Sequence, residues 1–204
     1  ALPIYDFIVV GAGIIGTATA YKLQLKFPDK SIAILEKETE VGLHQTGRNS
    51  GVMHSGIYYK PGSYKAINCN NGRNQLVNFA KKFNINHDVC GKVIVATTPD
   101  ELPILDEIYN RGIQNGTEGI CFLTSEEIKE KEPFITGKKA IWVPSAGIID
   151  YVDVVNNFLQ VVTQINSKSK LFTACEVQNI FRNKNEIIVH TDQGDFNAEK
   201  VIVC

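Results

Sequence analysis

Two short, mainly apolar runs separated by a segment of helical pattern open the chain. Residues 5–10 (YDFIVV) and 31–36 (SIAILE) have the composition that is typical of strands buried in a parallel sheet. Between them, the apolar positions of residues 14–27 follow helical spacing, and Pro28 and Asp29 end that helix. The pattern predicts a strand, a helix and a second, parallel strand, which is the start of an α/β domain.

The rest of the chain alternates between helical and strand-like patterns. Helices are predicted at residues 63–83, 99–111 and 152–165, and a capping box at 124–127 predicts a shorter one. The helix at 152–165 is expected to bury one apolar stripe, formed by Val155, Phe158, Leu159, Val162 and Ile165. Strands are predicted at residues 91–97, 140–143 and 200–204, with a hairpin of 174–181 and 186–191 around residues 183–185.

The composition is that of an ordinary globular protein. Hydrophobic residues make up 44% and charged residues 21% of the 204 positions, and the formal net charge is −1. This balance gives no reason to expect a nucleic-acid partner, and no apolar run approaches the roughly 20 residues of a transmembrane helix. The five cysteines are scattered singly, without a metal-binding motif. We therefore expect reduced thiols in an intracellular compartment, most of them buried as small hydrophobic residues.

A glycine motif joins the first predicted strand to the first predicted helix. Residues 11–16 read GAGIIG, and Glu36 closes the next strand about 20 residues further on. In this motif Gly11 allows a tight turn, Gly13 lets the backbone approach a pyrophosphate, and Gly16 lets helix and strand pack closely. The helix N-terminus attracts phosphates, and Glu36 can accept hydrogen bonds from ribose hydroxyls, which disfavours NADP. The pattern predicts a dinucleotide site; the alternative is a glycine-rich turn without a ligand.

A long loop after Glu36 indicates which dinucleotide is bound. An NAD domain usually continues into a third strand and helix, whereas Lys37 leads here into a glycine-rich stretch at residues 41–63. Within it, residues 46–51 (TGRNSG) combine glycines, hydroxyls, an amide and one cation, which suits the ribityl chain and ring of FAD. We therefore predict FAD as the cofactor; the alternative for this stretch is a disordered surface loop.

Several stretches in order along the chain carry a family resemblance. They are HQTGRNSGVMHSGIYYKPGS at 44–63, GKVIVA at 91–96, NGTEGI at 115–120, KEPF at 131–134, PSAGIIDY at 144–151 and VIVC at 201–204. Together they resemble the L-2-hydroxyglutarate oxidases and dehydrogenases, which belong to the D-amino-acid-oxidase-like (DAO) flavoprotein superfamily. Two positions depart from the family pattern, because histidine is expected where Arg48 stands and threonine where Ala146 stands.

The resemblance implies a fold and a domain organisation. We expect an α/β, Rossmann-like FAD-binding domain, with a parallel sheet plus a β-hairpin, formed by residues 1–84 and 151–204. Residues 85–150 would form part of an inserted α+β substrate-binding domain. In the family the chain continues beyond VIVC, and this sequence ends on an apolar run. We therefore expect a truncated N-terminal half that has little or no activity by itself.

The resemblance also assigns residues to the cofactor. Residues 46–52 would pass the pyrophosphate and the ribityl chain and reach the flavin ring. The backbone of Val177 would meet the adenine. The expected cofactor contacts, including those of the glycine motif, are Gly11, Gly13, Ile14, Ile15, Gly16, Glu36, Lys37, Thr46, Gly47, Arg48, Asn49, Ser50, Gly51, Val52, Val177 and Cys204.

For catalysis, the resemblance places His54 close to the flavin ring. His54 would then act as the base that removes the hydroxyl proton, or would orient the flavin, or would have neither role. Tyr58, Tyr59 and Lys65 could bind a dicarboxylate; alternatively the tyrosines pack the loop and Lys65 is solvated. His44 is expected to be a hydrogen-bonding residue of the loop.

Three functions remain after these steps. The favoured one is a FAD-dependent oxidoreductase that oxidises L-2-hydroxyglutarate to 2-oxoglutarate by hydride transfer to flavin N5. The alternatives are a related flavin dehydrogenase or oxidase acting on glycerol-3-phosphate or an amino acid, and a nucleotide-binding module without turnover. The electron acceptor is left open between oxygen, a quinone and an electron-transfer flavoprotein. We expect a location in the cytoplasm or the mitochondrial matrix, with peripheral membrane association left open.

Overall fold

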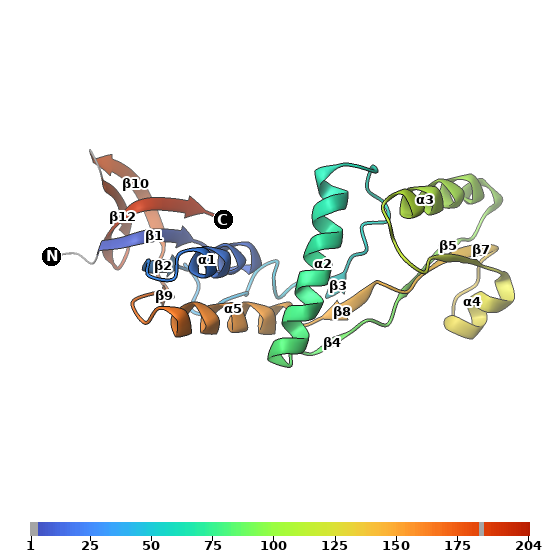
Figure 1. The fold of residues 1–204 in the computed structure, drawn as a ribbon, viewed down its shortest axis with the longest axis horizontal. Coiled ribbons are helices and arrows are strands. Elements are labelled where there is room, and N and C mark those ends of the chain that lie inside the picture. The colour runs from blue at the N-terminus through green and yellow to red at the C-terminus, as the bar shows by residue number, and fades with distance from the viewer. Residues whose placement is uncertain (1–3, 184–185) are drawn as a thin grey trace. The chain divides into compact units, whose positions relative to one another are not determined.

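A computed structural model describes residues 4–183 and 186–204 and divides the chain into two compact units (Figure 1). The first unit comprises residues 1–49 and 151–204, and the second comprises residues 50–150. The division after residue 150 coincides with the expected boundary, whereas the earlier division falls after residue 49 instead of after residue 84. Residues 50–84 pack with the second unit because Ile57 is fully buried in its core.

The first unit contains a six-stranded sheet with the strand order β10-β11-β12-β1-β2-β9. Strands β12, β1, β2 and β9 are parallel neighbours, and β10, β11 and β12 pair antiparallel. This mixture confirms the predicted α/β fold with a parallel sheet and a hairpin; the predicted tip residues 184 and 185 lie outside the described residues. The elements are β1 (Ile4–Val10), α1 (Ile14–Lys26), β2 (Ile32–Leu35), α5 (Tyr151–Ile165), β9 (Lys170–Phe172), β10 (Val177–Asn183), β11 (Glu186–Thr191) and β12 (Gly194–Val203).

Strand β12 is longer than the sequence pattern predicts. It begins at Gly194 rather than at residue 200, and its first half pairs antiparallel with β11, with Phe196 opposite Val189. Its second half pairs parallel with β1, with Val201 opposite Ile8. The first half was missed because the polar residues within 194–199 hide the period of two that marks a strand.

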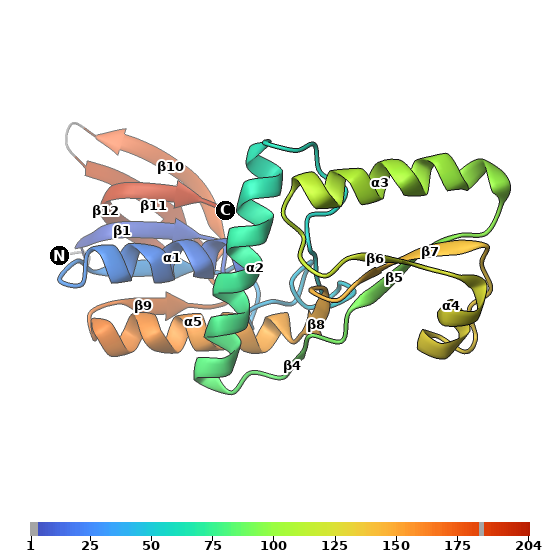
Figure 2. The ribbon, with the colours of Figure 1, turned by 45° about the vertical axis from the view of Figure 1, so that its right-hand side comes forward.

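Two apolar clusters hold the sheet of the first unit. One lies where α1 and α5 pack together, side by side in Figures 1 and 2, and contains Ala20, Ile34 and Val162. The other cluster lies on the opposite face of the sheet, because successive side chains of a strand point to opposite faces. It contains Ile8, Ala33, Leu35, Cys175, Val189, Phe196 and Ala198. The stripe predicted for α5 needs a correction, because Val154 is buried whereas Ile165, the last residue of the helix, is exposed.

The second unit contains two small antiparallel sheets, with strand orders β3-β8-β4 and β5-β7-β6. The predicted helix at 99–111 begins as a 3₁₀ turn, η1, and continues as α3. The elements are β3 (Val52–Met53), α2 (Tyr64–Phe83), β4 (His87–Asp88), β5 (Lys92–Ala96), η1 (Pro99–Glu101), α3 (Leu102–Gln114), β6 (Cys121–Leu123), α4 (Ser125–Lys131), β7 (Lys139–Val143) and β8 (Gly147–Ile149).

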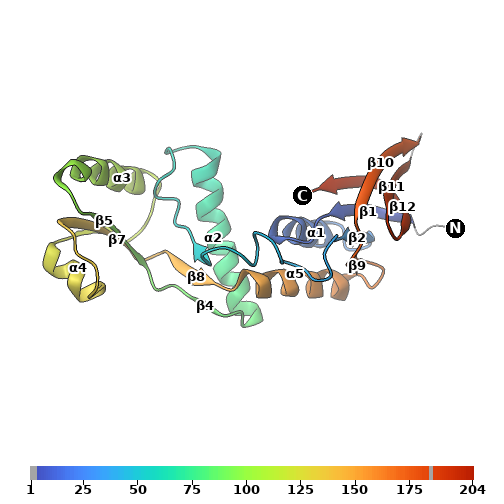
Figure 3. The ribbon, with the colours of Figure 1, turned by 180° about the vertical axis from the view of Figure 1, so that it is seen from behind.

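Helices α3 and α4 cover opposite faces of the β5-β7-β6 sheet, as Figure 3 shows. Alternation along β7 places Ile141 beneath α3 and Ala140 beneath α4, where Ile128 completes the cluster. The predicted capping box is present, because the Thr124 hydroxyl accepts from the Glu127 N–H and the Glu127 carboxylate accepts from the Thr124 N–H. The cap therefore fixes where α4 starts.

The cysteines differ from the prediction that most would be buried. All five are free thiols, and only Cys175 is buried. Cys69 is half-buried, and the other three are exposed, namely Cys90, Cys121 and Cys204. Cys90 lies in the loop between β4 and β5, Cys121 in the short strand β6 and Cys204 after β12, so none of the three is at an inward-facing core position. None of the helices in the described part of the chain is both long and apolar enough for a membrane span.

Candidate functional site

The glycine motif forms a turn in which close packing requires glycine at two positions. Gly11 has a φ of +99°, and a Cβ there would lie 2.8 Å from the carbonyl oxygen of Cys204. A Cβ on Gly16 would lie only 1.8 Å from the carbonyl oxygen of Gly11. The first turn of α1 therefore packs directly on the end of β1, as the motif predicts.

Glu36 follows the last residue of β2 and reaches across to this turn. Its Oε2 accepts a hydrogen bond from the Ala12 N–H at 2.7 Å, and its Oε1 accepts from the Glu38 N–H at 3.1 Å. The carboxylate is buried, with 9% of the residue exposed. Since each carboxylate oxygen has a second lone pair, both oxygens can still accept from a ligand hydroxyl.

Thr46 ties the long loop to the start of α1. Its Oγ1 accepts a hydrogen bond from the Ile14 N–H at 2.9 Å and would lie 3.3 Å from a Cβ on Gly13. The residue is buried. This hydrogen bond therefore holds the loop against the glycine turn. The N–H of Ile14, which was expected to face a phosphate, is already bonded to the loop.

Six of the expected cofactor residues line one cavity of about 320 Å³ in the first unit. Cavities of this size are in the usual range for small-molecule sites. The motif missed five lining residues that reach the cavity through tertiary packing: Val10, Leu35, His44, Cys175 and Glu176. The expected residues that line it are Gly11, Gly13, Glu36, Lys37, Val177 and Cys204.

The other expected residues of the first unit lie around this cavity without lining it. Gly16 is buried beneath the turn, and Ile15 is exposed on α1. Gly47, Arg48 and Asn49 are exposed residues of the loop. A glycine cradle with a buried carboxylate at its rim has the donor and acceptor set that fits the adenosine and pyrophosphate part of a dinucleotide. These residues therefore fit that half of FAD.

His44, predicted to be a hydrogen-bonding residue of the loop, has that role. Its Nε2 lies 2.7 Å from Glu38 Oε1. The hydrogen bond to His44 is the main cause that lowers the pKa of the Glu38 carboxyl, and the charges of Lys37 and Arg48 add to it. Arg48, which stands where histidine was expected, is exposed, and its charge acts on Glu38.

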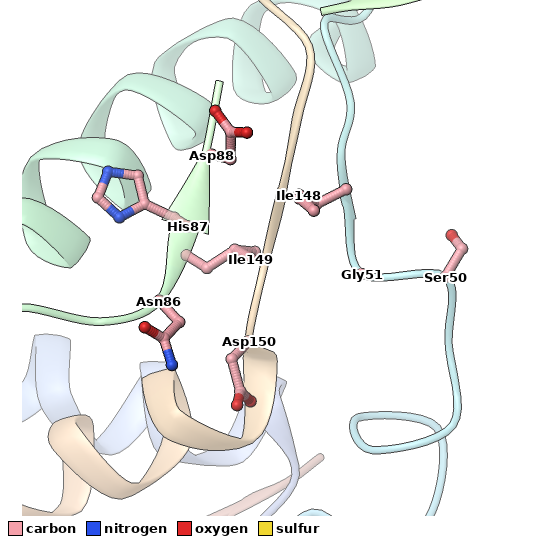
Figure 4. Close-up of a pocket in the computed structure, with 8 residues that line it drawn as sticks. All are labelled: Ser50, Gly51, Asn86, His87, Asp88, Ile148, Ile149 and Asp150. Atoms are coloured by element: carbon pink, nitrogen blue, oxygen red, sulfur yellow. The ribbon is translucent and has the colours of Figure 1, made fainter. Parts of the chain in front are cut away.

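Ser50 and Gly51 line a separate cavity of about 530 Å³ in the second unit (Figure 4). The remaining lining residues come from the ends of β4 and β8 and include two carboxylates, Asp88 and Asp150. Val52 lies beside them in β3, opposite Ile148 of β8. The expected cofactor residues are thus distributed over both units.

The loop that carries His54 is an ordered part of the second unit. Ile57 is fully buried in the cluster beneath α3. The Asn115 side chain donates hydrogen bonds to the carbonyl oxygens of Gly56 and Tyr59, at 3.3 and 2.8 Å. The alternative of a disordered surface loop is therefore wrong for this stretch. The sequence identifies Asn115 only as part of a family motif and gives no sign that its side chain bonds the loop backbone.

His54 itself lies at the surface of this loop. Its carbonyl oxygen accepts from the Cys69 thiol of α2 at 3.3 Å. Burial of part of the ring lowers the pKa of His54, and the charge of Lys92 lowers it further. Of the expected substrate residues, Tyr58 stacks against the ammonium of Lys92 at 4.7 Å from the ring centroid. Tyr58 therefore contacts a cation of the second unit, whereas the side chains of Tyr59 and Lys65 are exposed.

A glycine turn at a strand-to-helix junction, an acid that closes the next parallel strand and a cavity between them define a dinucleotide-binding α/β domain. The chain belongs to the DAO family of FAD-dependent oxidoreductases, because the model of that family matches residues 6–204. FAD is the cofactor of this family. The match confirms the fold class, the cofactor and the family resemblance that the sequence predicts.

Individual relatives agree with this assignment. The chain is 40% identical over 200 residues to an L-2-hydroxyglutarate dehydrogenase of Indibacter alkaliphilus, which covers 98% of this chain and 50% of that protein. It is 46% identical over 212 residues to the mitochondrial L-2-hydroxyglutarate dehydrogenase of Homo sapiens, covering 98% of this chain and 45% of that protein. The chain therefore spans about half the length of the curated relatives it matches.

A solved structure supports the fold. The L-alpha-glycerophosphate oxidase of Mycoplasma pneumoniae, dithionite-reduced and with FAD bound, superposes with a TM-score of 0.88 at 26% sequence identity. The match covers 98% of this chain and 53% of that one. The backbone of these residues is therefore that of a FAD-binding flavoenzyme.

Proposed function

We propose that the complete polypeptide carrying these residues oxidises L-2-hydroxyglutarate to 2-oxoglutarate as a FAD-dependent enzyme. The observation that carries this proposal is the identity of 40% and 46%, over 98% of the chain, to two proteins named L-2-hydroxyglutarate dehydrogenase. The matched region covers 98% of the chain and so includes the loop from His44 to Ser63, where the substrate-facing residues are expected.

Within this proposal, residues of the first unit hold the adenosine end of FAD. Glu36 accepts from the ribose hydroxyls, the turn at Gly11 and Gly13 receives the pyrophosphate, and the backbone of Val177 meets the adenine. Lys37 and Cys204, which line the same cavity, complete this end, while Ile14, Ile15 and Gly16 form the helix start behind the turn. Residues 46–52 continue along the ribityl chain towards the ring. When bound, FAD supplies a hydride acceptor at N5.

His54 has the proton-handling role in this scheme. A neutral imidazole can accept the proton of the substrate hydroxyl. Its lowered pKa keeps the imidazole neutral near physiological pH. The second role open to His54 is to orient the flavin. Tyr58, Tyr59 and Lys65 follow His54 closely in the sequence. In this scheme they contribute to substrate binding.

The names of the relatives also bear on where the enzyme works. The human relative is named as mitochondrial, and related dehydrogenases come from bacteria such as Escherichia coli. We infer a location in the mitochondrial matrix or the cytoplasm. The electron acceptor is oxygen, a quinone or an electron-transfer flavoprotein, and these are separated by supplying each one to the reduced enzyme.

One observation favours a second candidate function. The FAD-bound structure with a TM-score of 0.88 is a glycerophosphate oxidase, so the same backbone also serves a phosphorylated substrate. Glycerol-3-phosphate is therefore the competing substrate to test first, with amino acids next.

Anaerobic reduction of the flavin decides between these substrates. The complete gene product, loaded with FAD, is mixed with L-2-hydroxyglutarate, D-2-hydroxyglutarate, L-lactate, glycerol-3-phosphate and glycine in separate experiments. We expect L-2-hydroxyglutarate to bleach the visible flavin absorbance fastest. Faster bleaching by another compound would overturn the proposed substrate, and a protein that cannot be loaded with FAD would overturn the proposed function as a whole.

A further inference from the structure

Lys92 is a half-buried cation at the start of β5. Side chains alternate along a strand, so Lys92 shares its face with Ile94 and Ala96, which belong to the core cluster beneath α3. Its ammonium lies over the ring of Tyr58, 4.7 Å from the centroid. The charge is therefore held against the loop that carries His54 and is not free in solvent.

A second cation, Arg73 of α2, lies close enough to Cys69 for its charge to affect that thiol. Cys69 and Arg73 are one helical turn apart and lie on one side of α2. The Cys69 thiol donates to the His54 carbonyl oxygen, and Arg73 Nη1 donates to the carbonyl oxygen of Ser145 at 3.4 Å. Burial raises the pKa of the Cys69 thiol, while the charges of Arg73 and Lys92 oppose that rise. The charges of both Lys92 and Arg73 thus act on Cys69, whose thiol bonds the His54 carbonyl, and the charge of Lys92 also acts on His54 itself.

Neither cation has an acidic partner within residues 4–183 and 186–204, where the ion pairs involve other side chains. Lys92 is partly buried, so its charge is poorly solvated, and this burial lowers its pKa. A partly buried charge without a counter-ion is costly, and an anion that binds to it recovers part of that free energy. The site is therefore prepared for an anionic ligand.

We propose that Lys92 receives a carboxylate of the substrate and so places the substrate beside His54. This inference rests on the proposed function, because it takes the substrate to be a dicarboxylate. The cavity in Figure 4 is a poorer site for such a ligand, since Asp88 and Asp150 line it and would repel a carboxylate. The competing explanation is that Lys92 only stacks on Tyr58 as a structural cation–π contact.

Binding of glutarate separates these explanations. Glutarate has both carboxylates of the proposed substrate but lacks the hydroxyl, so it binds without being oxidised. Its Kd is measured by titration calorimetry on the FAD-loaded complete gene product, for the wild type and for Lys92→Met. The matched control is Lys131→Met, because Lys131 also stacks on an aromatic ring, 4.6 Å from the centroid of Trp142, but lies on α4.

We expect Lys92→Met to raise the Kd for glutarate by about tenfold or more, as for the loss of one hydrogen bond to a charged group. Lys92→Arg should recover part of the affinity, and Lys131→Met should bind as the wild type does. If the methionine variant does not fold, Lys92→Gln takes its place, since it removes the charge but keeps a polar side chain.

Two results would overturn the inference. One is a wild type that does not bind glutarate, and the other is a folded Lys92→Met or Lys92→Gln variant with unchanged Kd. Either result leaves the proposed function standing if L-2-hydroxyglutarate still reduces the flavin of the wild type. Failure of the flavin reduction, by contrast, would be seen without any Lys92 variant.

Discussion

At the scale of single residues, the surroundings of His54 favour the neutral form of its imidazole. Partial burial and the nearby charge of Lys92 both lower its pKa. An imidazole accepts a proton only when it is neutral, and a free histidine is neutral mainly above pH ~6.5. In this protein the neutral form therefore persists to lower pH than in a free histidine. The environment suits a base and also suits a neutral hydrogen-bonding partner of the flavin.

The pH dependence of kcat/KM tests the role of His54 as a base. In the complete enzyme, we expect the acidic limb to lie below the usual histidine pKa of about 6.5. Lys92→Met removes a repelling charge, so the pKa of His54 should rise and the limb should move to higher pH. His54→Asn should slow anaerobic flavin reduction by about a hundredfold and abolish the limb. A limb that stays in place in both variants means that another group titrates.

Glu36 is the residue whose loss should harm the cofactor site most. Glu36→Ala leaves the buried Ala12 N–H without its acceptor, at a cost of about 1–3 kcal/mol. We expect weaker FAD binding, by about tenfold or more, and a lower urea midpoint. Fluorescence quenching of FAD measures the affinity. Glu40→Ala, an exposed acid in the same loop, is the control and should bind FAD normally.

At the scale of elements, the length of each helix or strand decided whether it could be predicted from the sequence. The long helices were found because their apolar periodicity extends over several turns, and β1 and β2 because each is a continuous, mainly apolar run. Five strands of two or three residues were missed, since so short a stretch has no measurable period: β3, β4, β6, β8 and β9. Each of them is a strand because a neighbour pairs with it, which is a tertiary cause.

The same limit applies to the candidate site. Glycine spacing and Glu36 identified one side of the cavity from local pattern alone. Cys175 and Glu176 reach the cavity only because β10 follows them into the sheet, and no local signal marks them. Lys92 was counted as part of a strand, since only the packing of Tyr58 against it reveals a partly buried charge.

The junction of β1 and β2 should make the stability of the first unit depend on pH. Asp6 in β1 accepts hydrogen bonds from the backbone N–H and the hydroxyl of Ser31, at 2.7 and 2.9 Å, and from the Lys30 ammonium at 2.6 Å. Burial by itself would raise the pKa of Asp6, but these hydrogen bonds outweigh it and hold the pKa below the usual value. The ionised form therefore stabilises the fold.

Because the folded-state pKa of Asp6 is lowered, its contribution is complete above the unfolded value of about 3.9 and is lost as pH falls through the folded value. We expect Asp6→Asn to destabilise the protein by about 1 kcal/mol at neutral pH. The difference from wild type should shrink below pH ~4. Urea midpoints from circular dichroism at several pH values measure it. A deficit that is constant with pH, or equally large in the exposed Asp29→Asn, would contradict this explanation.

At the scale of the whole molecule, the expected FAD contacts are divided between the two compact units. The cavity of the first unit contains the glycine turn, Glu36 and Val177, which fit the adenosine end. Residues 50–52 belong to the second unit. The residues that we expect at the adenosine end, namely Gly11, Gly13, Glu36 and Val177, therefore line one cavity within a single unit.

Competition between ligands tests this division on the chain of 204 residues. We expect ADP to displace FAD from the purified chain, because ADP contains the parts that the cavity of the first unit fits. FMN, which has the flavin ring but no adenosine, should displace FAD weakly or not at all. Fluorescence of released FAD reports both titrations. Displacement by FMN that equals displacement by ADP would mean that the ring, and not the adenosine, supplies the affinity.

Strand β12 has a consequence for how the protein is made. It lies between β11 and β1, and its register pairs Ile4 with Asn197. The ribosome therefore synthesises this central strand long after its parallel neighbour β1. Until then one edge of β1 lacks its partner and must be kept from wrong pairings. Contacts so distant in sequence form slowly, so we expect the unpaired edge of β1 to be open to wrong pairings until β12 has been made.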